Sequence, residues 1–235
     1  CSTGTSLSGV AAAVKAARGP ILGMVENHAF PDPNWAEVLI EAHRGPWAGV
    51  CPVIEIFNPQ TLVSRTERLI DYGKWIARTE AAEIDRLPWH NSSYKRALVM
   101  QFENDLENVL EPEERLQDRL RAQGHRFYLD PRARTRHISD SKFSSACSGM
   151  FGRGRLFAAS RSKNWSLPKK LAYVLASPLF PFIQLYLVRD NFARFHNRYP
   201  AYRLLPMALL LTGVIALGEC AGYLAVGAAA LATGF

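Results

Sequence analysis

The triplet Glu26-Asn27-His28 brings a carboxylate and an imidazole within three residues, a combination that can hold a metal ion. It directly follows the apolar run Ile21 to Val25, which predicts a short buried strand. Ligands of open α/β sheets bind beyond the ends of such strands, and side chains two residues apart on an extended chain point the same way. The triplet therefore predicts a site for Mg²⁺ or Mn²⁺ against a diphosphate, with the imidazole favouring Mn²⁺. A solvated loop is the alternative.

Residues 89–96 form a second polar segment, with the sequence Trp-His-Asn-Ser-Ser-Tyr-Lys-Arg. A helix is expected to begin near Tyr94, with Ser92 or Ser93 as its N-cap, so that its first amides would face an anion. Asparagine and histidine side chains hydrogen-bond to hydroxyl groups, and aromatic rings stack on flat apolar faces. The segment therefore predicts a substrate-binding loop, and an ordinary capped loop is the alternative.

An acidic run in the middle of the chain supplies candidates for a catalytic base. Its members are Glu103, Asp105, Glu107, Glu111, Glu113 and Glu114. Most are expected on solvated helix faces, and the helix dipole alone explains carboxylates in the first turn of a helix that begins at Pro112. A base needs only one carboxylate within reach of a substrate hydroxyl. His137 follows a short predicted strand, and a structural role is the alternative for this lone histidine.

Motifs of several enzyme classes do not occur in the sequence. There is no Gly-x-Gly-x-x-Gly, Walker loop, Gly-x-Ser-x-Gly or His-Glu-x-x-His, which argues against Rossmann dehydrogenases, P-loop nucleotidases, serine hydrolases and zinc proteases. The four cysteines show no Cys-x-x-Cys spacing, so we expect neither a zinc knuckle nor a disulfide framework.

Three zones are expected to position these residues. Residues 1–138 predict an α/β domain, because helical patterns alternate with short apolar strands in the manner of a parallel or mixed sheet. Helices are predicted at 7–17, 35–43, 62–78 and 112–123, and strands at 21–25, 49–57, 127–129 and 133–137. Asn34 is the expected N-cap of the second helix, and Gly124 is expected to end the fourth.

The positive charge lies immediately before the most hydrophobic part of the chain. Residues 132–203 carry 14 Lys/Arg against 2 Asp/Glu, which gives a net charge of +12. Residues 139–203 are predicted to be a basic, mainly helical region whose apolar part lies in a membrane interface, because Pro178 and Pro181 interrupt it. Residues 204–235 carry only Glu219 and predict a hydrophobic membrane segment, either one tilted span or two short arms bent at Gly218-Glu219. No nucleic-acid motif accompanies the charge, so we expect an anionic membrane as the partner and no nucleic acid.

Taken together, these segments resemble the family-two glycosyltransferases, inverting enzymes with the GT-A fold. The resemblance lies in their order and spacing along nearly the whole chain. It is carried by residues 16–20 (Ala-Ala-Arg-Gly-Pro), 26–28 (Glu-Asn-His), 33–37 (Pro-Asn-Trp-Ala-Glu), 45–48 (Gly-Pro-Trp-Ala), 90–96 (His-Asn-Ser-Ser-Tyr-Lys-Arg), 110–113 (Leu-Glu-Pro-Glu), 119–124 (Arg-Leu-Arg-Ala-Gln-Gly) and His137.

The resemblance implies a GT-A-like mixed sheet and a role for each candidate. Glu26 and His28 stand where the family has its metal motif, His137 would complete the metal shell, and Glu113 would be the catalytic base. The substrate-binding residues that it implies are Asn27, Trp89, His90, Asn91, Ser92, Ser93 and Tyr94. The implied reaction is metal-assisted inverting displacement from a nucleotide-sugar donor onto a glycan or lipid-linked acceptor.

The resemblance also implies a location and leaves an alternative open. Similar membrane-linked members are bacterial, so we expect the inner membrane with the catalytic part facing the cytoplasm, against the anionic inner leaflet. The family's first strand and the aspartate that holds the nucleotide base are not found in this sequence. A catalytically inactive, truncated membrane remnant or scaffold of the same fold is therefore the second hypothesis.

Overall fold

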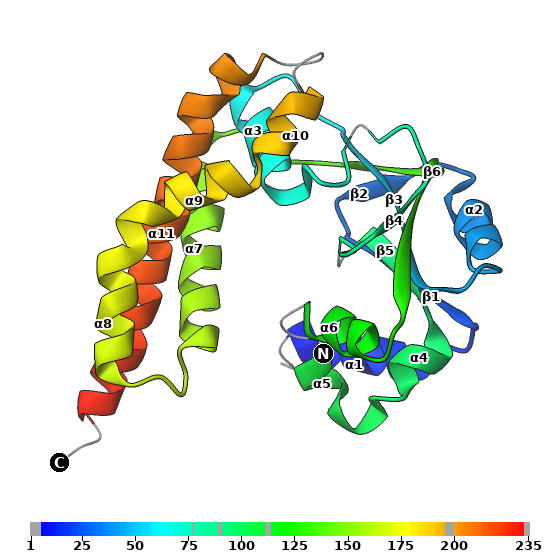
Figure 1. Cartoon of the computed structure of the whole chain (residues 1–235), viewed down its shortest axis with the longest axis horizontal. Helices are drawn as coiled ribbons and strands as arrows, with labels where there is room; N and C mark the ends of the chain where they lie inside the picture. Colours follow the sequence, from blue (N-terminus) through cyan, green and yellow to red (C-terminus); the bar gives the residue numbers. More distant parts are fainter. Residues whose placement is uncertain (1–5, 77, 89–90, 111–113, 196–199, 233–235) are drawn as a thin grey trace. The chain divides into compact units, whose positions relative to one another are not determined.

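The computed structural model describes residues 6–76, 78–88, 91–110, 114–195 and 200–232, which form two compact units (Figure 1). The α/β unit comprises Cys1–Glu55 and Trp75–His137, and the helical unit comprises Ile56–Lys74 and Ile138–Phe235. The chain is thus a mixed α/β protein with an additional bundle of helices, which agrees with the coarse fold prediction.

The described strands of the α/β unit form one sheet. They are β1 (Ile21–Val25), β2 (Ala29–Pro31), β3 (Trp47–Ile56), β4 (Ala82–Ile84), β5 (Asn91–Lys95) and β6 (Arg126–His137). The order is β1-β5-β3-β6-β2, and β4 also pairs with β6. The pairs β1–β5, β3–β5, β2–β6 and β4–β6 are antiparallel, and a parallel bridge joins Ile54 to Ile76.

Short helices enclose the apolar core of this unit. They are α1 (Ser6–Ala16), α2 (Trp35–Ala42), α4 (Arg96–Met100), η1 (Glu103–Asp105), α5 (Leu106–Val109) and α6 (Glu114–Ala122). Leu116 and Leu120 of α6 pack with Phe127 of β6 in the main core cluster. Helix α6 ends as predicted because Gly124 adopts a φ of 84°, a conformation that favours glycine, while the amide of His125 donates to the carbonyl of Leu120.

The helical unit consists of the segment between β3 and β4 together with the part of the chain that follows β6. Its helices are α3 (Leu62–Tyr72), α7 (Phe143–Arg161), α8 (Leu167–Ala176), η2 (Ser177–Leu179), α9 (Phe180–Leu187), α10 (Arg189–Phe195) and α11 (Ala201–Ala232). Figure 1 shows α7 and α11 side by side, and these two helices form the most extensive helix pair of the unit. Two stretches of this unit, Leu167–Leu187 and Tyr202–Ala225, are long and apolar enough to cross a membrane.

Three local predictions are wrong. The helix expected over 62–78 ends at Tyr72, because Trp75 and Ile76 join β3 instead. The two strands expected at 127–129 and 133–137 are one continuous strand, β6. The expected helix near Tyr94 is strand β5, and a helix begins only at Arg96. Helix α11 runs unbroken past Gly218-Glu219, so of the two forms expected for residues 204–235 the one bent at this point is excluded.

Candidate metal centre

Glu26 and His28 lie on a tight turn that joins β1 to β2. The amide of Ala29 donates to the carbonyl of Glu26 over 3.1 Å, which closes the turn after β1 has ended at Val25. The chain from Glu26 to His28 is therefore not extended. The prediction that these two side chains point the same way because they lie on an extended segment is wrong. The turn nevertheless brings Glu26 Oε2 and His28 Nε2 to 4.0 Å from each other.

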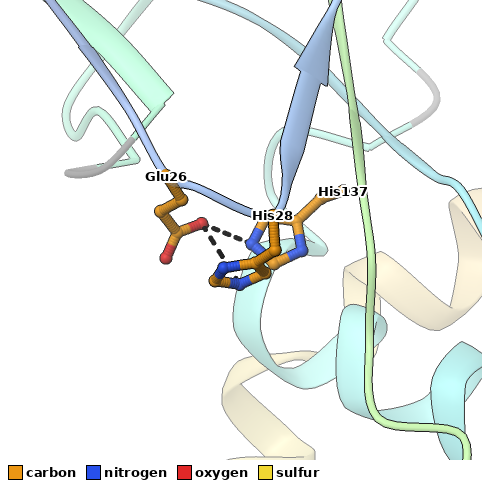
Figure 2. Close-up of side chains that lie close together, drawn as sticks. All are labelled: Glu26, His28 and His137. Atoms are coloured by element: carbon orange, nitrogen blue, oxygen red, sulfur yellow. Dashed lines mark hydrogen bonds and ion pairs between the residues drawn. The ribbon is translucent and has the colours of Figure 1, made fainter.

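Strand pairing brings the third residue to this turn. In the antiparallel register of β2 and β6, His137 lies opposite Ala29, the residue next to His28. The rings of His28 and His137 consequently meet edge to face, with their centroids 4.3 Å apart. The side chain of Glu26 forms a short hydrogen-bonded ion pair with His137 Nε2 (Figure 2).

The three residues form a cluster that opens to solvent on one side. One ligand atom from each of Glu26, His28 and His137 lies within 4.8 Å of the others. The side chain of His137 is buried at 5% exposure and that of Glu26 is 18% exposed, whereas that of His28 is 47% exposed. A small ligand could therefore reach the cluster from the side of His28.

Two asparagines orient the cluster from outside. Asn91 Nδ2 donates to Glu26 Oε2 over 2.9 Å, since Asn91 pairs with Val25 in the β1–β5 register and so lies beside Glu26. Asn27 Oδ1 lies 2.8 Å from His28 Nδ1. With Nδ1 directed at the Asn27 carboxamide, Nε2 is the ring nitrogen that faces Glu26 and is placed to bind a metal ion. Such outer partners fix the ring orientation of metal-bound histidines.

The donor set fits a divalent transition metal better than magnesium. Two imidazole nitrogens and one carboxylate oxygen suit Mn²⁺ and related ions, whereas Mg²⁺ prefers an all-oxygen shell. Ligand atoms about 2.1 Å from a shared ion lie roughly 3 to 4 Å apart, so these three side chains need only small rotations to bind one. We therefore regard Glu26, His28 and His137 as the residues that could hold Mn²⁺, with positions left open for a ligand.

The expected substrate-binding loop is in large part a buried strand. Ser92, Ser93 and Tyr94 have at most 1% of their surface exposed and belong to a strand, so the predictions of a loop and of a serine N-cap here are wrong. Ser93 Oγ donates to the carbonyl of Val50 and lies 2.9 Å from His43 Nε2. Asn91 of this strand contacts one of the candidate metal ligands, Glu26.

The remaining site predictions lie outside the described residues. These are Trp89, His90 and the proposed base Glu113.

Sequence reasoning placed Asn91 in the wrong setting and did not single out His43. Asn91 lies beside Glu26 only through the pairing of β1 with β5, and no local pattern encodes that pairing. His43 was unremarkable in the sequence because its partners Ser93 and Lys95 come from a distant strand. The hydrogen bond between His43 and Ser93 can be predicted only when the tertiary position of β5 is known.

Comparisons with known proteins identify no family. No protein-family model matches the chain, and no curated protein matches it. The resemblance to family-two glycosyltransferases therefore rests on the residues alone.

Proposed function

We propose that this chain is a membrane-associated, metal-assisted inverting glycosyltransferase that moves a sugar from a nucleotide-sugar donor to a glycan or lipid-linked acceptor. Its proposed place is the cytoplasmic face of a bacterial inner membrane. The observation that supports the proposal best is the convergence of Glu26, His28 and His137 on one point, where β1 and β6 end and β2 begins. His137 lies more than a hundred positions from Glu26 and His28 in sequence, yet the resemblance implies all three as ligands of one metal ion.

The proposed reaction assigns complementary tasks to the named residues. Glu113 accepts the proton of the acceptor hydroxyl as its oxygen forms a bond to the anomeric carbon. The bond from that carbon to the diphosphate breaks with its electron pair on the departing oxygen, so the configuration inverts. A divalent ion on the cluster would stabilise the negative charge of the departing diphosphate. Asn91 holds the Glu26 carboxylate, and Asn27 holds the ring of His28.

Metal binding by the purified full chain is the first test. Titration with Mn²⁺ alone, followed by calorimetry or by the loss of the free Mn²⁺ spin signal, is expected to give one site per chain. His137→Gln and Glu26→Gln should each weaken that site at least tenfold, since such changes remove one of three ligands. His125→Gln and Glu37→Gln are the matched controls and should bind Mn²⁺ as the unaltered chain does.

Sugar transfer is the second test. Membranes that contain the chain are incubated with labelled UDP- and GDP-sugars and Mn²⁺, and incorporation of label into lipid or polysaccharide is measured. Glu113→Gln should abolish transfer while leaving Mn²⁺ binding intact, and Glu107→Gln is the control for loss of a nearby carboxylate. Normal Mn²⁺ binding without any transfer would favour the inactive scaffold, and absence of both would refute the proposed site.

A further inference from the structure

Helices α7 and α11 of the helical unit touch backbone to backbone along much of their length. A Cβ atom added to Gly154 of α7 would collide with the carbonyl oxygen of Ile215, and one added to Gly218 of α11 would collide with that of Phe151. Gly222 likewise contacts the carbonyl of Arg155. Small residues permit such close approach. Met150 of α7 shares a core cluster with Leu211, and farther along Arg161 donates to the hydroxyl of Tyr223, so the two helices run parallel.

Charged residues lie level with the middle of the apolar stretch in α11. The stretch runs over Tyr202–Ala225, so its centre is close to Ile215, the residue that Gly154 contacts. Arg153 precedes that glycine and forms an ion pair with Asp71 of α3 over 2.6 Å. Helix α3 also packs on α11 at the same level, where Val63 and Leu211 belong to one core cluster.

A membrane-spanning orientation of α11 would therefore carry this ion pair into the hydrocarbon. Charged side chains at that depth are costly, and they are rare unless they serve transport or gating. The apolar stretch of α11 is long enough to cross a bilayer. The helices packed against it carry the Arg153–Asp71 ion pair, which does not suit the hydrocarbon layer.

Other faces of the unit are apolar and open. Leu175 is 81% exposed, Phe182 62% and Leu217 64%, and they come from α8, α9 and α11 respectively. Side chains of this size are exposed along α8, α9 and α11, and α8 and α9 each pack on α11. An apolar surface of this extent marks an interaction site.

Charge and aromatic residues identify the partner as an anionic lipid leaflet. Residues 141–188 contain seven Lys/Arg and no Asp/Glu. Arg161 lies 5.3 Å from the centre of the Trp165 ring and 5.0 Å from that of Tyr173, and Lys169 lies 4.2 Å from that of Trp165. Tryptophan, tyrosine and basic side chains gather at the headgroup level of membranes, where anionic lipids attract the positive charge.

We propose that the helical unit lies in the plane of one anionic membrane leaflet and does not cross the bilayer. The apolar faces of α8, α9 and α11 enter the boundary between headgroups and acyl chains, as in-plane amphipathic helices do, while the charged sides of α3 and α7 stay toward headgroups and water. This inference rests on the membrane association within the proposed function, and it does not depend on sugar transfer.

Depth measurements along α11 test the orientation. Leu205, Leu210, Leu217 and Leu224 are 41%, 56%, 64% and 50% exposed, and each is replaced singly by cysteine and labelled with a nitroxide. Cys1, Cys147 and Cys220 are replaced by alanine in the full chain, and the buried Cys51 is kept. The first and last of the four positions are about 28 Å apart at 1.5 Å per residue, close to the thickness of the hydrocarbon core.

The two orientations give different depth profiles on vesicles of phosphatidylcholine with anionic phosphatidylglycerol. An in-plane helix places all four labels at similar, shallow depth. A spanning helix places Leu210 and Leu217 near the midplane and the other two near opposite surfaces, which would overturn the proposal. Labels that are not in lipid at all, with chains that associate through this face in solution, would overturn it as well and would also refute the membrane association.

A charge substitution provides an independent readout. Leu175→Glu is expected to weaken partition to the anionic vesicles at least tenfold, because it places a carboxylate in the apolar layer. Ile40→Glu on α2, where Ile40 is 53% exposed, is the matched control and should leave partition within twofold of the unaltered chain. Equal effects of both changes would contradict the assignment of this face to lipid.

Discussion

Replacing His43 by glutamine is expected to remove most of the acid sensitivity of the α/β unit. His43 is 6% exposed and its Nε2 lies 2.9 Å from Ser93 Oγ. Burial, reinforced by the nearby positive charge of Lys95, lowers the pKa of His43 from 6.5 to about 4. The folded unit therefore keeps the imidazole neutral at pH values at which the unfolded chain already protonates it.

The sign and size of the effect follow from proton linkage. Between pH 4 and 6.5 the unfolded state binds more protons at His43, so stability falls as the pH falls through this window. At 1.36 kcal/mol per pKa unit the loss is about 2 kcal/mol at pH 5 and about 3 kcal/mol below pH 4. Above pH 6.5 His43 contributes no pH dependence.

The helical unit contains a group with the opposite linkage. Burial and then the neighbouring carboxylate of Asp71 raise the pKa of Glu67 from 4.5 to about 7. Here the folded state binds more protons between pH 4.5 and 7, so this unit becomes more stable on acidification. The gain is on the order of 1 to 2 kcal/mol, because Glu67 remains partly solvated. A measurement of unfolding of the whole chain would combine the destabilisation from His43 with the stabilisation from Glu67 at acidic pH.

Hydrogen exchange read by mass spectrometry separates the two units. Exchange of peptides from α2 and β5 is compared at pH 5 and pH 7 after correction for the intrinsic rates, and peptides from α3 report on the other unit. We expect the α2 and β5 amides to lose about 2 kcal/mol of protection at pH 5, and those of α3 to gain protection. His43→Gln should abolish the first change only, and His125→Gln should alter neither.

Two results would refute this reasoning. One is equal protection of α2 and β5 at both pH values in the unaltered chain. The other is a loss of about 2 kcal/mol that persists in His43→Gln, because the titrating group would then lie elsewhere.

Three further substitutions test the packing. Gly218→Val should cost at least about 2 kcal/mol, seen as faster proteolysis of the helical unit, since its side chain would meet the backbone of α7. Gly124→Ala should cost about 1 kcal/mol in urea unfolding, because the φ of 84° is unfavourable for alanine. Gln117→Leu should cost roughly 2 to 4 kcal/mol in the same assay, because Gln117 hydrogen-bonds to the amide and the carbonyl of Leu87 and to the hydroxyl of Tyr94.

Elements whose signals are local were predictable from the sequence. The strand Ile21–Val25 has the expected bounds, and α2 begins at the expected residue with Asn34 as its N-cap. Even here the detail differs, because the side chain of Asn34 does not cap the helix but donates to the carbonyl of Arg132. The spacing of apolar residues and the boundaries of helices depend on residues that are close in sequence. The hydrogen-bond partner of a polar side chain depends on the tertiary fold.

The candidate site was predictable only in part for the same reason. Glu26 and His28 stood out because they follow an apolar run that predicted a buried strand, although Val25 at its end is 43% exposed, and His137 was added through the resemblance. The register of β2 with β6 brings them together, and it spans more than a hundred residues. Ser92 and Ser93 were predicted as N-caps because serine commonly caps helices, whereas here the neighbouring strands bury them. Polar residues in a central strand carry no local sign of that burial.

Helix α11 shows why hydropathy alone overstates a membrane span. One side of the helix is apolar because Gly218 and Gly222 let its backbone touch α7, and other positions are apolar and exposed, as at Leu217. A helix between protein and a lipid leaflet thus has the same composition as one that crosses the bilayer. The two orientations place the neighbouring helices α3 and α7 in different surroundings. These helices carry the Asp71–Arg153 ion pair, which is stable near headgroups and water and costly in hydrocarbon. The charges that favour the in-plane orientation are therefore encoded in α3 and α7, far from the apolar segment itself.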